Sequence, residues 1–209
     1  MTASAKPDLH STLIQSAARL LDDHGPGALT ARRLAAEAGT STMAVYTHFG
    51  GMRELRRAIQ REGFARLAEA WQAVEATPDP VADLSVSGAR YVFFALGNPN
   101  LYRAMFFETP LDEDDEAIAN ATATEVSIIQ RCIDAGRFNQ ADPWSLGWTL
   151  LAATHGVVAW ILAGVIKLDA ADQHLDRLGI SLFVGFGDTP AAARRSIGRA
   201  RARVRQPAA

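Results

Sequence analysis

Cysteine is almost absent from this sequence of 209 residues, which contains only Cys132. A single thiol cannot form an intrachain disulfide, and it excludes any metal site built from several cysteines. We therefore expect Cys132 to be a small core residue of a protein in a reducing compartment. The first seven residues also lack the apolar stretch of a secretory signal, which favours a cytoplasmic location.

The motifs of common catalytic sites are missing as well. The sequence has no nucleophile elbow, no glycine-rich phosphate loop and no zinc-binding His/Glu spacing, and its five histidines are scattered. The acidic run 112–116 lacks the spaced Asp and Gly of a calcium loop, so solvated surface is favoured there over a metal site. We predict that the protein is not an enzyme and has no catalytic residue, metal ligand or cofactor.

Charge is unevenly distributed, although the formal net charge is only −2. Residues 1–66 carry a net +3, residues 67–190 a net −11 and residues 191–209 a net +6. An acidic middle segment cannot lie against DNA phosphates, whereas both ends can. This pattern fits a DNA-contacting module joined to a body held off the DNA. The arginine-rich end is interpreted as a solvated terminus, with contact to DNA or to the acidic body as the alternative.

Apolar residues recur at helical spacing along nearly the whole chain, and no segment shows the alternation of a strand. We expect helices at about 9–24, 31–38, 41–47, 52–76, 81–97, 100–107, 116–135, 143–167, 171–187 and 190–205. The sequence therefore predicts an all-α protein. Its N-terminal three-helix domain, with a helix-turn-helix, would cover residues 1–52, and a larger helical bundle for ligand binding and dimerisation would cover residues 53–209.

Capping side chains mark several of these helix starts. Thr30 and Ser41 stand before the second and third helices, where their hydroxyls can accept a backbone hydrogen bond. Asn98, Asp142 and Thr189 each stand before a proline at a first helical position. These signals predict where the chain enters each helix.

Residues 31–50, with the sequence ARRLAAEAGTSTMAVYTHFG, have the spacing of a helix-turn-helix. Such a motif needs a small residue where its two helices touch and a glycine at the turn. Ala35 and Gly39 supply these, and Phe49 can close the base of the motif against the first helix. A plain helical hairpin is the alternative for these twenty residues taken alone.

A longer window around this motif resembles the tetracycline-repressor (TetR) family of bacterial regulators. The matching residues are Leu13-Ile14, Ala17-Ala18, Leu21, His24-Gly25, Leu29-Thr30, Leu34-Ala35, Ala38-Gly39, Ser41, Val45-Tyr46, His48-Phe49 and Glu54-Leu55. Residues 98–106, with Trp148 and His155-Gly156, resemble more weakly a C-terminal domain of the WHG type found in some members. The resemblance implies a homodimeric regulator, usually a repressor, that binds DNA and senses a small molecule.

Small side chains at the start of the second motif helix suit close approach to base edges, and Tyr46, His48 and Arg53 can reach phosphates. The resemblance implies DNA contacts for Thr30, Ser41, Thr42, Ala44, Tyr46, Thr47 and His48. The full set of candidates is Thr30, Thr40, Ser41, Thr42, Met43, Ala44, Tyr46, Thr47, His48 and Arg53. Many family members carry a lysine at the start of the fourth helix. This chain has Met52 there, which leaves Arg53 as an imperfect substitute.

Aromatic side chains with a few polar neighbours gather in the larger predicted domain. An apolar cavity of this kind would take a small apolar or aromatic effector. The candidate ligand contacts are Phe94, Tyr102, Met105, Phe106, Trp148, Ala152 and His155. For any single aromatic residue among them ordinary core packing is favoured, and for His155 a satisfied core histidine is favoured, while for the group as a whole a pocket lining and a plain core are both open.

Residues 145–166 contain no charged side chain, and the stretch is long enough to span a membrane. His155, hydroxyl residues and glycines dilute it, so we favour a helix buried in its own domain and against a second copy of the chain. The candidate dimer contacts are Val158, Leu162, Leu175, Leu178, Leu182 and Phe186. A two-fold dimer would place its recognition helices roughly 34–36 Å apart, which matches a palindromic operator in double-stranded DNA. A DNA-binding dimer without an effector and a helical membrane-associated protein are the alternatives.

Overall fold

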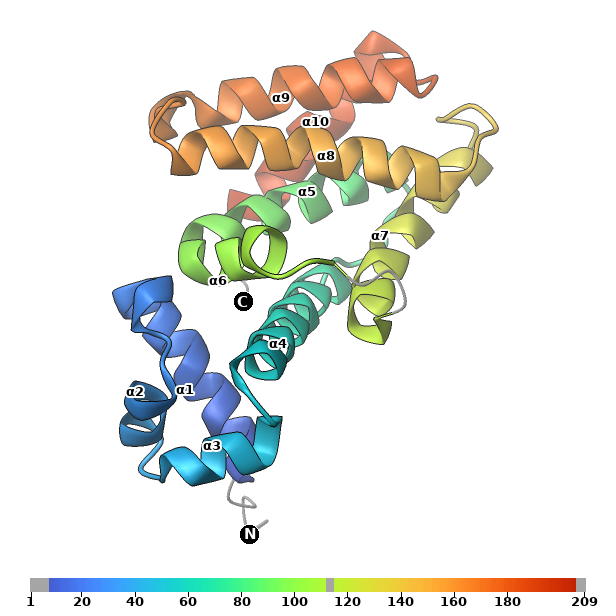
Figure 1. Cartoon of the computed structure of the whole chain (residues 1–209). Helices are drawn as coiled ribbons and strands as arrows, with labels where there is room; N and C mark the ends of the chain where they lie inside the picture. The colour runs from blue at the N-terminus through green and yellow to red at the C-terminus, as the bar shows by residue number, and fades with distance from the viewer. Residues whose placement is uncertain (1–7, 112–114, 206–209) are drawn as a thin grey trace, which may run out of the picture. The chain divides into compact units, whose positions relative to one another are not determined.

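The computed structural model describes residues 8–111 and 115–205, and all regular structure in these ranges is helical (Figure 1). The elements are α1 (Leu9–His24), η1 (Pro26–Ala28), α2 (Ala31–Glu37), α3 (Thr42–Phe49), α4 (Met52–Gln72), α5 (Pro80–Gly97), α6 (Pro99–Arg103), η2 (Ala104–Glu108), α7 (Glu116–Asp134), α8 (Pro143–Leu162), α9 (Leu168–Gly185) and α10 (Pro190–Arg205). The predicted all-α fold is confirmed. Most of the acidic run, residues 112–114, lies outside the described ranges.

The predicted helix starts agree with the capping geometry at most positions. Asp142 accepts hydrogen bonds from the backbone N–H groups of Trp144 and Ser145, and Thr189 accepts one from Ala192. Asn98 is the exception, since it precedes α6 without a side-chain capping bond. The end of α8 is also earlier than predicted, at Leu162 rather than residue 167, because the chain turns at Gly164 with a φ of 74°.

The described residues form two compact units, and α4 contributes to both. Unit 1 comprises the chain up to Arg66 together with Asn98–Ile118, and unit 2 comprises Leu67–Gly97 with the chain from Ala119 onward. Unit 1 thus includes a segment from the middle of the sequence. The functional division after residue 52 stays a prediction.

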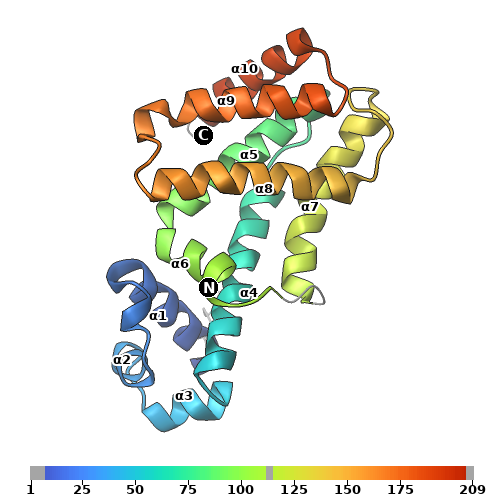
Figure 2. The same ribbon diagram turned by 45° about the horizontal axis from the view of Figure 1, so that its top comes forward.

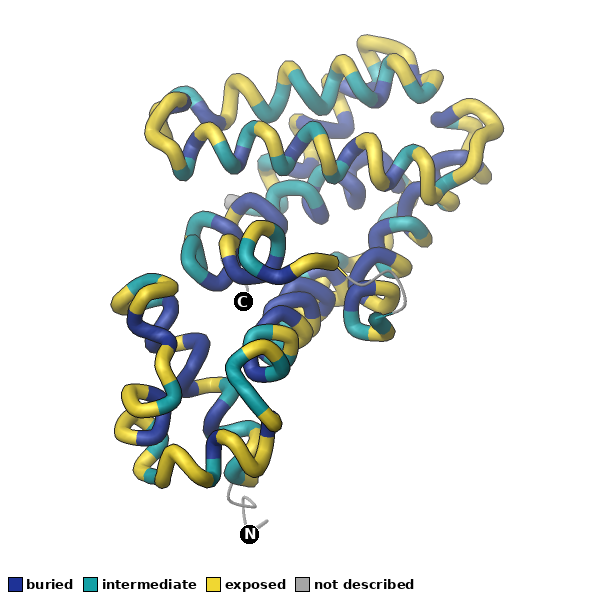
Figure 3. The backbone as a smooth tube through the Cα atoms, in the orientation of Figure 1, coloured by how far each residue is buried: buried dark blue, intermediate teal, exposed yellow. Residues whose placement is uncertain are grey.

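The first three helices of unit 1 enclose a core of aliphatic side chains, and Figure 3 colours the buried positions of α1–α3 dark blue along the backbone. Leu13, Leu21, Leu34 and Leu55 are fully buried there. The first helix begins where the Asp8 carboxylate accepts a 2.7 Å hydrogen bond from the Ser11 N–H. Burying each large aliphatic side chain contributes about 1.5–3 kcal/mol, so this small core can hold the exposed helices α2 and α3 in place.

The segment 98–118 joins unit 1 through α6 and η2. The amide nitrogen of Asn100 donates to the backbone carbonyl of Asp22 in α1 over 3.1 Å. The element η2 is a π-helical turn, which leaves backbone carbonyls without their usual partners. Buried Gln60 of α4 compensates, because its Nε2 donates to the carbonyls of Met105 (2.8 Å) and Thr109 (3.1 Å).

Unit 2 contains the end of α4, all of α5, α7 from Ala119 onward, and α8–α10. Helices α8 and α9 lie side by side, while α10 packs against α5 and α9 (Figures 1 and 2). Cys132 of α7 is a fully buried free thiol, as predicted, and burial raises its pKa to about 12. It is therefore an uncharged core side chain at any physiological pH.

The arginines of α10 hold this helix to the start of α5. Arg203 bonds the fully buried Asp83 carboxylate over 2.7 Å, and Arg131 of α7 bonds the same carboxylate over 2.9 Å. Burial alone would raise the pKa of Asp83. Hydrogen bonds from Thr77, Arg203 and Arg131 outweigh burial and hold that pKa below its usual value. The carboxylate is thus ionised, as a buried charge with several donors should be.

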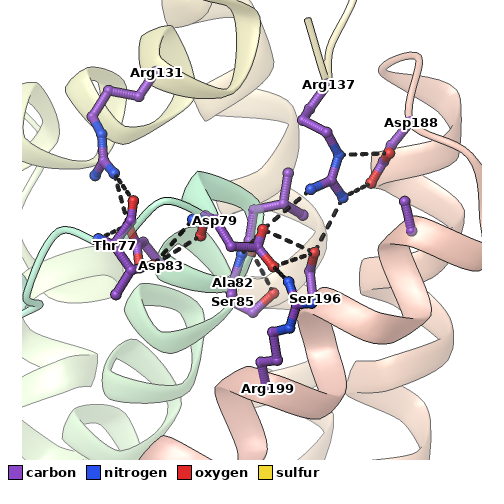
Figure 4. Close-up of polar contacts among 12 residues, drawn as sticks. Thr77, Asp79, Ala82, Asp83, Ser85, Arg131, Arg137, Asp188, Ser196 and Arg199 are labelled. Atoms are coloured by element: carbon purple, nitrogen blue, oxygen red, sulfur yellow. Dashed lines mark hydrogen bonds and ion pairs between the residues drawn. The ribbon is translucent and has the colours of Figure 1, made fainter. Parts of the chain in front are cut away.

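A second part of the network centres on Asp79, which joins three elements (Figure 4). The Asp79 carboxylate accepts from Ser196 (2.9 Å) and Arg199 (2.8 Å) of α10, and Arg137 reaches it over 3.1 Å. Arg137 also forms an ion pair with Asp188, which raises the pKa of its guanidinium. The prediction of a solvated arginine-rich tail is therefore wrong for Arg203, whose side chain is 29% exposed and neutralises the buried Asp83, whereas Arg199 is 63% exposed and also pairs with Asp79.

Candidate DNA-binding surface and effector cavity

Helices α2 and α3 form the predicted helix-turn-helix. Ala35 and Val45 are almost fully buried between the helices, and Gly39 makes the turn with a φ of 64°. The turn is closed by a 2.8 Å hydrogen bond from the Thr40 N–H to the Ala35 carbonyl. Phe49 closes the base, where its ring packs at a tilt against His10 of α1 at a centroid distance of 4.8 Å. The backbone of α3 is thereby fixed on one side only.

The other side of α3 carries most of the predicted DNA contacts. Met43 is 72% exposed and Tyr46 is 48% exposed, although both are large and partly apolar. Thr42, Thr47 and His48 are exposed, and Ala44 is half-buried. An exposed row of short hydroxyl and methyl groups flanked by an aromatic ring can approach base edges and backbone phosphates.

Two of the predicted contacts also cap helices. Ser41 Oγ accepts a 3.1 Å hydrogen bond from the Ala44 N–H at the start of α3, and Thr30 Oγ1 accepts one of 3.3 Å from the Arg33 N–H at the start of α2. Both predicted caps are thus confirmed. Because each hydroxyl accepts from the backbone, its own O–H proton points away and is available to a phosphate oxygen.

Basic side chains lie on both sides of this motif. Arg53 is 83% exposed, and its only ion pair in the described part of the chain is with its neighbour Glu54, over 3.1 Å. An exposed pair of this kind is weak, so a phosphate can compete for the guanidinium. Arg32 and Arg33 of α2 are also exposed. They were not among the predicted contacts, although two adjacent arginines directly after the capping Thr30 could have indicated a phosphate-binding position.

Three predicted ligand contacts belong to unit 1 and pack among themselves. Tyr102 and Met105 are fully buried, and Phe106 is half-buried. The Tyr102 and Phe106 rings lie 5.0 Å apart, and Phe106 meets Phe64 of α4 edge-on at 5.3 Å. Their role in binding a ligand stays a prediction.

The other four predicted ligand contacts belong to unit 2. Trp148 is 50% exposed, Ala152 is exposed, and Phe94 and His155 are half-buried. His155 Nδ1 lies 3.0 Å from the hydroxyl of buried Tyr91, whose ring stacks on Trp71. Burial lowers the pKa of His155, so the neutral imidazole is favoured and can share a proton with Tyr91.

Unit 2 also contains a cavity of about 190 Å³ that sequence reasoning missed. Its walls come from α5, α8, α9 and α10, and none of the seven predicted ligand contacts lines it. Among its lining residues are Leu84, Val92, Leu150, Phe183, Ile197 and Val204. The arginine-rich sequence of α10 hid this apolar side, whose residues recur at 197, 200 and 204 between the arginines.

Buried Glu125 of α7 is a further titratable group that the sequence did not indicate. It lies beside a small pocket with Trp144, Gly147 and Trp148 of α8. Burial raises its pKa to about 7, and neither an ion pair nor a hydrogen bond to it is found in the described part of the chain. A carboxyl group in this position is protonated for much of the time at neutral pH.

Helix α8 buries a single stripe and leaves the rest of its apolar surface open. Gly147, Leu150, Thr154, Val158 and Ile161 form the buried stripe. The helix is long and apolar enough to cross a membrane, with a mean hydropathy of 1.4, and 28% of its apolar stretch is buried in the structure. Figure 3 shows the alternation of exposed and half-buried backbone along α8 and α9.

The predicted dimer contacts are distributed over both helices. Val158 of α8 is fully buried within unit 2, whereas the other five predicted contacts, Leu162, Leu175, Leu178, Leu182 and Phe186, are half-buried.

No group of three or more His, Cys, Asp or Glu side chains within residues 8–111 and 115–205 could hold a metal ion.

Two family models match the chain. The model of bacterial regulatory proteins of the tetR family matches residues 13–59, and that of a tetracyclin repressor-like C-terminal domain matches residues 84–179. Together they cover more than half of the sequence. No curated protein matches it. The finer expectation of a WHG-type C-terminal domain stays a prediction.

Solved structures share the fold at low sequence identity. A protein with unknown function from Rhodococcus sp. RHA1 is 23% identical, with a TM-score of 0.74 over 90% of this chain and 100% of its own. RolR in complex with resorcinol is 17% identical, with a TM-score of 0.68 over 91% and 93% of the two chains. AibR in complex with isovaleryl coenzyme A and operator DNA is 19% identical, with a TM-score of 0.55 over 83% and 97%. At these identities the likeness shows the fold alone.

Proposed function

Because the chain belongs to the tetR family of bacterial regulatory proteins, which are DNA-binding transcription regulators and not enzymes, we propose that it is a cytoplasmic, homodimeric repressor. The dimer binds a palindromic operator through α3 and is released by a small apolar or aromatic effector. The observation that carries the proposal is the exposed face of α3, which presents Thr42, Met43, Tyr46 and Thr47 from a helix fixed on its other side.

The distribution of charge supports DNA as the partner. Net positive charge is confined to residues 1–66 and 191–209, and α10 uses arginines of the second group to neutralise Asp79 and Asp83. The first group includes the exposed Arg32, Arg33 and Arg53 around the helix-turn-helix. Phosphate contacts from these side chains release counterions, so operator affinity falls as salt concentration rises.

The open face of α8 supports a second copy of the chain as the protein partner. Opposite the buried stripe lie Ala152 and Gly156, which are exposed, flanked by the exposed rings of Trp148 and Trp160. Small residues allow two helices to approach closely, and the tryptophans at the edges can cover the contact. Leu168 of α9, 68% exposed, extends the apolar surface. Pairing these faces around a two-fold axis buries them in a soluble dimer without a membrane.

Release by a ligand requires that the effector bind one conformer of the dimer more tightly than the other. Helix α4, whose residues belong to unit 1 at its start and to unit 2 at its end, can transmit such a difference. The complexes of RolR with resorcinol and of AibR with isovaleryl coenzyme A and operator DNA support an effector-binding role for this fold. A DNA-binding dimer without an effector is the alternative.

The decisive experiment is a gel shift of the purified protein on the intergenic DNA upstream of its own gene, titrated with salt. We expect a specific shift that Tyr46→Ala weakens at least about tenfold, because the exposed ring is lost from the DNA-facing surface. Gln130→Ala, an exposed substitution on α7 of unit 2, is the matched control. Failure to bind this DNA, and any site selected from the genome, would overturn the proposal.

A further inference from the structure

The cavity in unit 2 exists because residues with small side chains face it from three helices. Gly88 and Ala89 of α5, Gly179 of α9 and Ala200 of α10 all line it. A Cβ placed on Gly88 would have no neighbouring atom within 4 Å, whereas one on Gly179 would meet Ile197 at 3.3 Å. The space is therefore open on the α5 side and closely packed on the α9 side.

Most of the wall of the cavity is apolar. Leu84, Leu150, Phe183 and Ile197 belong to the main core of unit 2, and each is at most 8% exposed. Phe93 and Asp172, which also line the cavity, are exposed, so the cavity opens to solvent, and an apolar occupant that covers its apolar wall would stabilise the folded protein. The volume of about 190 Å³ fits a molecule with a single ring and a short chain.

One end of the cavity is polar and carries a negative net charge. Arg201 is its only basic lining residue, against Asp172 and Asp176. The Arg201 guanidinium lies 2.9 Å from the Asp176 carboxylate and 3.8 Å from that of Asp172, and it also donates to the Asp172 carbonyl over 3.1 Å. All three contacts use the same guanidinium nitrogen, Nη2, and two carboxylates face this one cation, so a carboxylate ligand would meet a net negative charge at this end. Two carboxylates sharing one guanidinium retain acceptor capacity for an ammonium or hydroxyl group.

We propose that this cavity between α5, α8, α9 and α10 is a ligand site for a small apolar or aromatic molecule that carries one hydrogen-bond donor, an amine or a hydroxyl, and not an acid. The apolar body fills the space beside Gly88, and the donor group lies against Asp176 and Asp172. This assignment rests on the proposed function only in that the occupant would be the effector. The lining of this cavity differs from the ligand contacts predicted from the sequence. Of those predicted contacts, Phe94 and His155 are used below to test whether the ligand binds elsewhere.

The site is tested by isothermal titration calorimetry of the full chain without DNA. Three probes share one body and differ in the head group: 4-phenylbutylamine, 4-phenylbutan-1-ol and 4-phenylbutyrate. We expect the amine and the alcohol to bind at least about tenfold more tightly than the acid. No binding of the amine or the alcohol would overturn the assignment, and so would binding in which the acid is preferred.

Variants locate the binding. Gly88→Phe should fill the cavity and weaken binding of every probe at least about tenfold, while Gly97→Phe, the same change at an exposed position of α5, should leave binding unchanged. Ala200→Leu fills the same cavity from α10 and serves if Gly88→Phe fails to fold, as judged by circular dichroism. Loss of binding in Phe94→Ala or His155→Ala with normal binding in both cavity variants would place the ligand elsewhere and overturn the assignment.

Asp176→Asn tests the polar end. Removing this carboxylate frees part of the Arg201 guanidinium, so the order of affinities should shift toward 4-phenylbutyrate. An unchanged order would contradict the proposed position of the head group. Since all these titrations omit DNA, a failed gel shift would contradict the regulatory function and leave the site standing, while a failed titration would contradict the site and leave the DNA binding standing.

Discussion

Helices α3 and α8 both leave much of their surface in solvent, but they expose opposite chemistry. The eight residues of α3 present hydroxyls, an imidazole and a phenol around Met43. The twenty residues of α8 carry no charge, and their open face is made of small residues between two tryptophans. Exposed hydrogen-bonding groups beside arginines suit a polyanion, whereas an exposed apolar face suits another apolar face. The kind of exposed group, more than the degree of exposure, indicates the partner.

The strongest test of this comparison is a charge in the middle of the open face of α8. Gly156→Glu should weaken self-association roughly a thousandfold, because a two-fold interface would receive two buried, unpaired carboxylates. Replacing a helical glycine does not itself destabilise the helix. Sedimentation velocity over a range of concentrations measures the effect, and Gly156→Ala is the control that should remain dimeric. A dimer of unchanged strength in the Glu variant would place the interface elsewhere.

Glu125, which lines a small pocket with Trp144 and Trp148 of α8, gives the next largest effect. Its pKa is raised by burial to about 7 in the folded protein, against 4.5 when exposed. The folded state therefore binds more protons between these values, so the free energy of unfolding falls as pH rises through this window and levels off above it. The free energy of unfolding of Glu125→Gln should not fall in this window, and at pH 8 it should exceed that of the wild type by up to about 3 kcal/mol.

Urea denaturation at pH 5 and at pH 8 measures the Glu125 effect. The control is Glu116→Gln, which changes an exposed glutamate of the same helix. An equal free energy of unfolding for Glu125→Gln and wild type at both pH values would show that Glu125 is solvated in the folded protein.

A negative charge on α3 should weaken DNA binding and leave self-association unchanged, the reverse of what is expected for Gly156→Glu. Met43→Glu places a carboxylate beside the DNA phosphates and should weaken operator binding by about 2 kcal/mol, some thirtyfold, without changing self-association. Fluorescence anisotropy of labelled operator measures the first property and sedimentation the second. If Met43→Glu changed sedimentation, or Gly156→Glu left the protein dimeric but unable to bind DNA, the division of roles between α3 and α8 would not hold.

The smallest expected effect concerns the cap of α3. Ser41→Ala removes the acceptor for the Ala44 N–H and should lower the free energy of unfolding by about 1 kcal/mol. Ser41→Asp restores an acceptor but adds a negative charge, so it should recover the stability and still bind operator weakly. If Ser41→Asp recovered both the stability and the operator affinity, the Ser41 hydroxyl would act as a cap and not as a phosphate contact.

Much of the DNA-binding half could be predicted because its signals are local. The capping bonds of Thr30 and Ser41 join atoms three residues apart, and the left-handed turn at Gly39 depends on one residue. Such features are determined by residues close together in the sequence, and their geometry hardly depends on the rest of the chain. The predicted α1–α3 boundaries accordingly agree with the structure to within two residues.

The effector half resisted prediction where distant segments decide what a side chain touches. The sequence predicts a solvated terminus for the arginines of α10, but Arg203 bonds Asp83, which lies 120 residues earlier in the sequence. The aromatic residues predicted as ligand contacts are as apolar as ordinary core residues, so composition alone could not distinguish a residue that lines a cavity from one that packs in the core.

By itself, the sequence determined the all-α class, most of the helix starts, the helix-turn-helix and the family, because helical periodicity, capping and turn geometry act over a few residues. Tertiary structure alone decided that residues 98–118 join unit 1, that Glu125 is buried and that a cavity opens beside Gly88. These properties depend on which helices pack together and how closely. Packing sums weak contacts between residues far apart in the chain, and no local pattern records that sum.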